Sequence, residues 1–496
     1  MAFVDPSHIT QIGVRRSSQA HAPSLRGPRK LCEFAPLSPA EQRLVSELDS
    51  GEDIVIADGQ TPSLEAHPDR AIRAAFIRCL LLESSDELGA GRTRVHEKGL
   101  RLLGAAIEGT LDLQSCVIAH DLTFKNCRFS SVLNLDAARI EGLCLNGSVL
   151  PGLRAEWLVA RGAVTLDSVE ANGEIRLIGA KIRGQLDCDN CRISNPGRNA
   201  LSLVRADIGG AFFLRGKASI DGLLNMTGAH LRSIVDACDC WPKVGNLNLS
   251  GCVYESFLMT ASVSAKARLR WLRLQRSATP GEFSPQPFEQ CALVLRQAGH
   301  ADDARVILIE KERLQRRAER SRAPAPLRQA KWLRDCLLGG TIRYGHAPML
   351  ALVWLLGFWI LGTAVSSFVY REHAFKPGIS VLRRAEWMAC AGTRANSWSA
   401  ASVRERVVGR ALPRESQLEC FLRQPESRTH PRFSASMYSL DTLLPVVSLG
   451  LDDYWSPDET KRWGTLGQLY VWLQIIVGWA LTFLTVAGFS GLVKTK

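Results

Sequence analysis

The residues best suited to chemistry lie in one short segment near the C-terminus, Ser436 to Trp455. The segment reads SMYSLDTLLPVVSLGLDDYW and is apolar apart from hydroxyl groups and three carboxylates. With a proline and an aspartate inside it, its apolar part is too short to cross a bilayer, which takes about 20 apolar residues. Backbone carbonyls and acidic side chains are groups that line cation pathways. The candidate pore-loop residues are Asp441, Thr442, Pro445, Ser448, Gly450, Asp452 and Asp453.

Two uncharged stretches flank this segment and could hold it in a membrane. Ala347 to Tyr370 and Gly464 to Val493 are both long and apolar enough to span a bilayer. The spacing predicts a short helix over Ser436 to Leu444, ended by Pro445 and followed by an extended limb. An aspartate inside a membrane segment is costly and usually functional, which singles out Asp441.

This layout resembles the two-span pore module of tetrameric cation channels. Aligned on Gly450, the potassium signature T-V-G-Y-G-D has Val446 for its threonine and Ser448 for its first glycine, so potassium selectivity is not supported. Non-helical backbone at membrane depth needs protein or water around it, so a pore implies a homo-oligomer, most simply a tetramer. The alternative is an amphipathic segment lying on the outer membrane surface. Both alternatives stay open.

A second candidate for chemistry is the motif CDNC, Cys188 to Cys191. Both cysteines fall on positions of an internal repeat that face inward, where cysteine packs as a small apolar residue. Together with the absence of a second CxxC motif or a histidine pair, this predicts neither a metal site nor a redox pair.

The repeat runs from Leu100 to Tyr254. Leu100, Leu102, Ala105 and Ile107 recur eleven residues later as Leu111, Leu113, Cys116 and Ile118, and the signature returns to Leu247, Leu249, Cys252 and Tyr254. A glycine often precedes the first leucine. A short fixed period marks a solenoid, and this one predicts a four-sided β-coil of about 22 residues per turn. The repeat resembles the pentapeptide-repeat proteins, which implies a right-handed quadrilateral β-helix.

Charge is distributed unevenly along the chain. The whole chain has 61 Lys+Arg against 49 Asp+Glu, a net charge of +12. Residues 100–255 carry 16 of each, so mimicry of DNA by an acidic surface, known in some pentapeptide-repeat proteins, is not expected, nor is nucleic-acid binding. The excess lies partly in a basic run before the first span. This run predicts lipid-anchor residues: Arg316, Arg317, Arg320, Arg322, Arg328, Lys331 and Arg334.

The expected fold is mixed β/α: a β-solenoid with a short helical cap, a helical hairpin and two transmembrane helices, with either a re-entrant pore loop or a surface-lying segment. The expected boundaries are a disordered basic tail (1–45), a helical cap region (46–98), the β-helix (99–260), a hairpin with a basic juxtamembrane linker (261–342) and a two-span module (343–496) with an outer loop (371–463). The basic flanks place both termini in the cytoplasm and the protein in an inner bacterial-type membrane. Cys390 and Cys420 could then pair in the oxidising outer loop.

Three functions are open from the sequence. The first is a sensor–effector whose cytoplasmic β-helix controls or assembles a pore; the second is a membrane-anchored scaffold whose β-helix recruits a protein partner. The third is an enzyme, since proteins of this architecture are sometimes labelled membrane-associated oxidoreductases. GxGxxG, CxxCH and GxSxG motifs are absent. We therefore expect neither enzymatic activity nor a cofactor.

Overall fold

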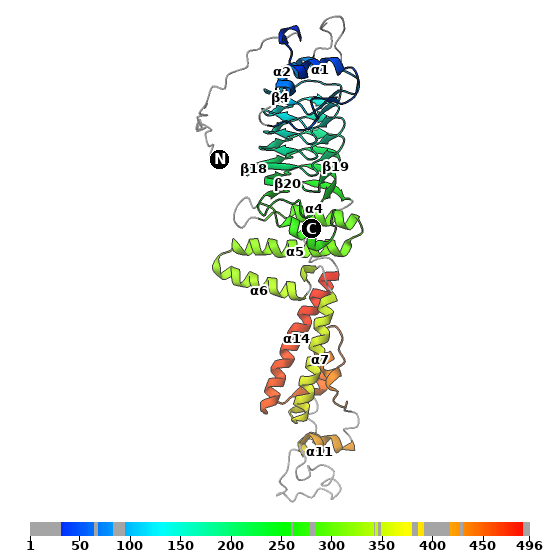
Figure 1. Ribbon diagram of the computed structural model, residues 1–496. Coiled ribbons are helices and arrows are strands. Elements are labelled where there is room, and N and C mark those ends of the chain that lie inside the picture. The colour runs from blue at the N-terminus through cyan, green and yellow to red at the C-terminus, as the bar shows by residue number, and fades with distance from the viewer. Residues whose placement is uncertain are drawn as a thin grey trace, which may run out of the picture. The chain divides into compact units, whose positions relative to one another are not determined.

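The computed structural model describes residues 31–63, 68–82, 95–258, 261–276, 283–341, 343–345, 349–378, 385–390, 417–425 and 430–489. The chain forms two compact units, Met1–Arg276 and Ser277–Lys496, which are described separately. Figure 1 shows the stacked strands of the first unit and the long helices of the second.

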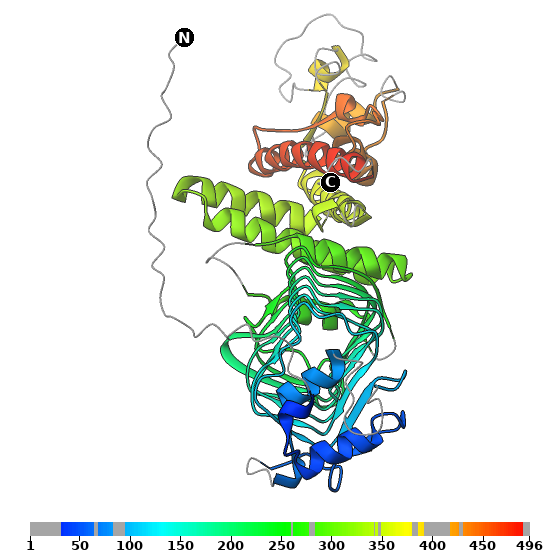
Figure 2. The same ribbon diagram turned by 90° about the horizontal axis from the view of Figure 1, so that it is seen from above.

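The first unit is a β-solenoid of about seven turns. Its strands are parallel and belong to two sheets, and long strands from β18 onward join two strand stacks within each sheet. Seen from above in Figure 2, successive coils lie over one another. One sheet contains β1 (Ile54–Val55), β3 (Leu100–Leu103), β5 (Leu122–Lys125), β8 (Arg139–Ile140), β9 (Leu143–Cys144), β12 (Val159–Ala160), β13 (Val164–Thr165), β16 (Lys181–Ile182), β17 (Leu186–Asp187), β19 (Asp207–Leu214), β21 (His230–Asp236) and β23 (Val253–Phe257).

The other sheet has the same construction. Its strands are β2 (Ala71–Arg73), β4 (Ala106–Glu108), β6 (Arg128–Phe129), β7 (Leu133–Asn134), β10 (Val149–Leu150), β11 (Leu153–Arg154), β14 (Glu170–Ala171), β15 (Ile175–Arg176), β18 (Arg192–Ser202), β20 (Ser219–Asn225) and β22 (Leu247–Asn248). Leu100 pairs with Leu122 and Leu122 with Leu143, so equivalent repeat positions stack from turn to turn.

The inward positions of the repeat form the core, as the sequence predicts. Leu102, Ile107 and Leu113 are each at most 1% exposed, and the corresponding leucines and phenylalanines of later turns are buried too. Small residues such as Cys127 and Ala138 fill the positions between them. Cys116 differs, because it lies only half-buried in the second turn. The eleven-residue repeat therefore describes the packing of nearly every turn.

Glycine is required at the corners for two different reasons. Gly99 adopts a φ of +89°, a left-handed conformation that side chains disfavour. Gly184 instead stacks directly on Gly162, and a Cβ on Gly184 would lie 2.6 Å from the carbonyl carbon of Gly162. Close approach of adjacent coils thus excludes a side chain there.

Charged side chains on the coils pair between successive turns. In six pairs the acid precedes a base that lies 18 to 26 residues later in the chain. The pairs are Asp136–Arg154, Glu141–Arg161, Glu156–Arg176, Glu170–Arg192, Asp189–Arg215 and Asp221–Lys243. The even charge balance of the repeat therefore corresponds to a regular inter-turn pattern.

The N-terminal cap begins earlier than the sequence predicts. The cap contains η1 (Leu31–Phe34), α1 (Pro39–Glu47), η2 (Pro68–Arg70) and α2 (Ala74–Leu82). The prediction of a disordered tail over 1–45 is wrong for residues 31–45, because a Ser38–Glu41 capping box starts α1 and Leu44 is fully buried. Residues 1–30 lie outside the described residues. In α2, the apolar side chains of Phe76 and Ile77 are fully buried.

A further helix, α3 (Ala265–Leu272), closes the C-terminal end of the solenoid unit. Its Arg268 is fully buried and donates two hydrogen bonds of 2.8 Å to the carboxylate of Asp236 in β21. The guanidinium lies 3.6 Å from the ring centroid of Phe257. The last strand, β23, ends at Phe257, and α3 extends the compact unit to residue 276.

The second unit starts with the predicted hairpin, α4 (Gln286–Gln297) and α5 (Ala301–Ser321), joined at Gly299. The region predicted as a basic linker contains a third helix, α6 (Ala325–Thr341), and a short η3 (Arg343–Gly345). Two long helices follow, α7 (Met349–Arg371) and α14 (Arg462–Phe489), which pack together. Between them lie β24 (Phe375–Pro377), α9 (Ala385–Cys390), α11 (Gln417–Arg423), α12 (Ala435–Leu443), α13 (Leu451–Tyr454) and β25 (Trp455–Pro457).

Candidate functional site

Helices α7 and α14 could cross a membrane by their length and composition. The apolar parts of these helices are Met349–Arg371 and Arg462–Ala487, with mean hydropathies of 2.0 and 1.8. Only 17% and 22% of their most apolar windows are buried within the protein. The core helix of a soluble protein would be mostly buried, so these surfaces fit contact with lipid better than contact with a protein core.

The predicted pore-loop helix forms as α12 and packs against both long helices. Gln474, midway along α14, is 1% exposed and donates hydrogen bonds of 2.8 Å to the carbonyl and hydroxyl oxygens of Ser439. The Ser439 hydroxyl in turn donates to the Trp359 carbonyl of α7 at 3.0 Å, and the Trp359 indole donates to the Ser436 carbonyl at 2.9 Å. Polar contacts therefore tie α12 to the middle of α7 and α14.

Two glycines let the three helices approach closely. A Cβ on Gly362 of α7 would collide with the Ser439 hydroxyl, and a Cβ on Gly478 of α14 would collide with the Leu443 carbonyl oxygen. Small residues serve this purpose where helices pack within a membrane. The site is thus a tight three-helix junction whose polar groups face one another.

Asp441 organises the chain that follows α12. Its carboxylate accepts hydrogen bonds from the backbone N–H groups of Leu449 and Leu451 at 2.6 Å each, and of Asp452 at 3.1 Å. The latter two N–H groups open α13, so Asp441 stabilises the start of that helix from outside. Gly450 makes this turn with a φ of +73°. The expected fully extended limb instead folds back on Asp441.

The remaining pore-loop candidates are placed differently from one another. Thr442 is buried and its hydroxyl donates to the Tyr438 carbonyl at 3.0 Å, while Pro445 follows the end of α12. Ser448 is exposed between apolar neighbours: Val446 is 79% exposed and Leu449 45%. Asp452 and Asp453 are exposed in α13. The structure thus brings together Asp441, Gly450 and Asp452, whereas the side chain of Thr442 is turned into the helix.

Aromatic residues hold the base of this junction. The rings of Tyr370 and Phe433 stack at 4.5 Å, and Phe375 and Tyr438 pack edge to face at 5.3 Å. Trp455 lies in the same cluster, only 1% exposed, and its indole donates to the Pro431 carbonyl at 3.0 Å. Trp455 therefore packs inside the protein, whereas Trp463 is 38% exposed.

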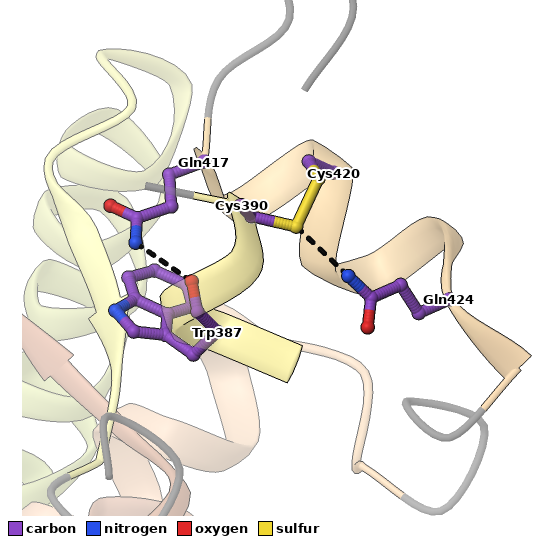
Figure 3. Close-up of a disulfide and its surroundings, with 5 residues drawn as sticks. All are labelled: Trp387, Cys390, Gln417, Cys420 and Gln424. Atoms are coloured by element: carbon purple, nitrogen blue, oxygen red, sulfur yellow. Dashed lines mark hydrogen bonds between the residues drawn. A yellow bond between two sulfur atoms is a disulfide. The ribbon is translucent and has the colours of Figure 1, made fainter. Parts of the chain in front are cut away.

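A disulfide joins Cys390 of α9 to Cys420 of α11, with the two Cα atoms 5.9 Å apart (Figure 3). The Gln424 amide donates to the Cys390 sulfur at 3.0 Å, and Gln417 donates to the Trp387 carbonyl at 3.0 Å. This pairing is the one considered from the sequence, and it links two short helices of the segment between α7 and α14.

The other twelve cysteines are free thiols. Cys188 and Cys191 of the CDNC motif are fully buried, and burial raises the pKa of Cys127 to about 12 and that of Cys252 to about 12. Such thiols are inert and act as apolar packing groups. Within the described residues, no group of three or more acidic, cysteine or histidine side chains could hold a metal ion.

The predicted lipid-anchor residues divide between α5 and α6. Arg316 and Arg320 of α5 approach the buried carboxylate of Asp335 in α6, at 3.6 and 3.0 Å, and Arg334 lies 3.3 Å from it. Arg317, Arg322 and Arg328 are exposed, and Lys331 is half-buried. A single exposed basic face is thus not what forms, because part of the basic run turns inward around Asp335.

The sequence reading missed Gln474, Ser439 and Asp335. Gln474 carried a usable signal, since it is one of two glutamines in an uncharged stretch, where polar side chains commonly bond between helices. Comparisons with protein-family models, with curated proteins and with solved structures give no match.

Proposed function

We propose that this protein is an integral membrane sensor–effector in which the β-solenoid controls or assembles a channel-like pore. In this proposal α7 and α14 span the membrane and residues 436–455 form a re-entrant loop. The solenoid is then a right-handed quadrilateral coil of the pentapeptide-repeat type. The observation that carries the proposal is the attachment of α12 to Trp359 and Gln474, both near the middle of their helices.

The attachment favours a re-entrant segment over a surface-lying one. A segment on the membrane surface would contact the ends of α7 and α14, not Gly362 and Gly478. The Asp441 hydrogen bonds also satisfy three backbone N–H groups of a non-helical turn, as hydrocarbon surroundings demand. Both features support placement of the loop within the membrane.

The exposed limb supports an oligomer. Val446, Val447 and Leu449 are each at least 45% exposed in the protomer. In an oligomer, most simply a tetramer, these residues would meet other copies around a central axis. The exposed Ser448 would then lie beside the pathway, which is a role that its side chain is free to take.

The cysteines support the topology. The Cys390–Cys420 disulfide requires an oxidising compartment, whereas Cys188 and Cys191 remain thiols although they are three residues apart. A loop at 371–463 outside an inner membrane and a solenoid in the cytoplasm account for both. Alkylation of Cys390 and Cys420 in intact cells should therefore require a reductant, and a reductant that does not cross the membrane should be sufficient.

The alternative is a membrane-anchored scaffold whose solenoid recruits a protein and whose helices only anchor. In that case an unrelated two-helix anchor could replace residues 343–496 without loss of function.

The deciding experiment uses Ser448→Cys in purified protein reconstituted into planar bilayers. A charged methanethiosulfonate reagent should reduce the single-channel current of Ser448→Cys. It should leave Thr460→Cys unchanged, since Thr460 is exposed between β25 and α14, outside the segment 436–455. Currents that ignore modification at Ser448 would place the pathway elsewhere, and silence from folded, oligomeric protein would favour the scaffold.

A further inference from the structure

A cavity of about 600 Å³ lies between α5, α6 and η3 in the second unit. Five arginines line it, Arg313, Arg316, Arg317, Arg320 and Arg343. Among the described residues of its wall, Asp335 is the one acid. The cavity is therefore strongly cationic, and its walls belong to one compact unit.

Asp335 cannot neutralise this charge. It is 5% exposed and its two oxygens face Arg316, Arg320 and Arg334 at once. Within the described part of the chain, Arg317 and Arg343 form no ion pair. At least two guanidinium groups thus face the cavity without an anion, and like charges so close together destabilise one another unless an anion joins them.

Arg316 has one side-chain nitrogen that lacks a hydrogen-bond partner. Its Nε is buried without a hydrogen-bond partner, and the nearest carboxylate oxygen, Oε2 of Glu312, is 3.5 Å away, in ion-pair range but too far for a good hydrogen bond. The Arg316 guanidinium lies 5.0 Å from the ring centroid of Tyr344. Tyr344 holds this place with a left-handed φ of +56°. The donors are therefore held in position before any ligand binds.

We propose that this cavity binds a phosphate group. Arginine donates paired N–H groups in a planar fork that matches phosphate oxygens, and several forks around one site suit a phosphate better than a lone carboxylate. The phosphate belongs either to an anionic phospholipid head group or to a soluble phosphate compound. The site was not expected from the sequence, where these arginines were interpreted as a diffuse lipid anchor.

The surroundings fit a ligand that arrives from a membrane surface. Trp332 lines the cavity and is 56% exposed, as are Leu333 and Leu337 on α6. Four residues after Gly345, at Met349, the first candidate span begins. Acyl chains could thus lie along α6 while the phosphate enters the cavity. The site stands whether or not the module conducts ions.

Cys336 provides a direct readout, because it is an exposed thiol in the cavity wall, and exposed Cys32 in the other unit serves as internal control. The full-length protein in detergent is alkylated with N-ethylmaleimide, and the rate at each cysteine is read by mass spectrometry. Dioctanoyl phosphatidylglycerol should slow alkylation of Cys336 about fivefold or more and leave Cys32 unchanged. Dioctanoyl phosphatidylcholine tests zwitterionic lipid, and inorganic phosphate tests a soluble ligand.

Matched variants distinguish a specific phosphate site from general electrostatic attraction of anions to the basic region. Arg317→Ala and Arg343→Ala should abolish protection of Cys336, and Arg317→Lys should weaken it because the paired donors are lost. Arg322→Ala and Arg328→Ala remove equal charge from the same region outside the cavity and should keep it. Protection by phosphate alone identifies a soluble ligand, and protection only by phosphatidylglycerol identifies a lipid. Lack of protection with every probe, or equal loss in the Arg322 and Arg328 variants, would overturn the proposal.

Discussion

The buried side-chain amide of Gln474 donates both of its N–H groups to Ser439, to the carbonyl and the hydroxyl oxygen at 2.8 Å each. These two contacts connect the middle of α14 to α12. Helix contacts of this polar kind contribute about 0.6 to 1.7 kcal/mol each within membranes. The Gln474 amide is therefore the polar link between α12 and α14, beside the link through Trp359 to α7.

Replacing Gln474 by leucine should lower the free energy of unfolding by about 1 kcal/mol or more, since the carbonyl and hydroxyl oxygens of Ser439 lose their Gln474 donor. Unfolding of the detergent-solubilised protein with sodium dodecyl sulfate measures this loss. Gln468→Leu is the control, because it makes the same substitution on the same helix at a half-buried residue. Equal effects of the two variants would show that the Gln474 contact does not hold α12.

Asp441→Asn should loosen the limb after α12 without unfolding the protein. A hydrogen bond to a charged acceptor contributes about 1.5 to 3 kcal/mol, so backbone N–H exchange at Leu449, Leu451 and Asp452 should accelerate about tenfold or more. Hydrogen–deuterium exchange measures this change. Asp453→Asn removes the same charge from the same limb but leaves the Asp441 contacts in place. If both variants exchange alike, charge rather than these three contacts orders the limb.

Arg268→Ala should be among the most destabilising substitutions in the solenoid unit. It leaves the carboxylate of Asp236, which is 3% exposed, without its bidentate partner, and breaking a buried pair costs about 3 to 5 kcal/mol. Pulse proteolysis of the full-length protein across a urea series measures the shift. Arg270→Ala, two residues away on α3, removes an exposed guanidinium that donates to the Cys238 carbonyl at 3.4 Å and lies 5.6 Å from the Trp241 ring centroid, and it should cost far less. A small effect of both would mean that α3 is not needed to close the coil.

Glu41 should make the N-terminal cap sensitive to acid. Burial alone would raise the pKa of Glu41, but hydrogen bonds from Arg73 and Ser38 outweigh burial and hold that pKa below the ordinary 4.5. A lowered pKa contributes stability that is full above pH 4.5 and is lost as the pH falls through the folded value.

The difference between the protein and its Glu41→Gln variant should therefore be large near pH 7 and shrink below about pH 4. Proteolysis of the segment that contains α1 reports it. Glu47→Gln removes a surface pair with Arg43 and should show little difference at either pH. A constant difference for Glu41→Gln across this range would mean that packing, not ionisation, stabilises the cap.

Residues that repeat could be predicted from the sequence, and residues that pair once could not. Leu102 and Ile107 predict a coil because residues of the same type recur at fixed intervals in every turn. Arg268 and Asp236 lie 32 residues apart and occur in one place only, so no period marks them. The contact of α3 with the last coil therefore could not be predicted.

The segment 436–455 likewise contains one part that could be predicted from the sequence and one part that could not. The helix over 436–444 followed from apolar spacing and Pro445, and it forms as α12. Asp441 was singled out as costly in an apolar stretch, and its partners are backbone N–H groups eight to eleven residues later. Side-chain types carry no information on where a limb turns back, so the folded-back shape could not be predicted.

The charged pairs between successive turns of the solenoid all have the same orientation along the chain. In every inter-turn pair from Asp136–Arg154 to Asp221–Lys243 the acid belongs to the earlier turn and the base to the later one. A coil cut anywhere would therefore show bases without partners at its N-terminal face and acids without partners at its C-terminal face. Two such faces attract, so bare coils would join head to tail into a polymer of indefinite length. At the two ends of the coil, α1 forms the pair Glu41–Arg73 with β2, and α3 forms the pair Arg268–Asp236 with β21. These terminal helices should therefore prevent such polymerisation.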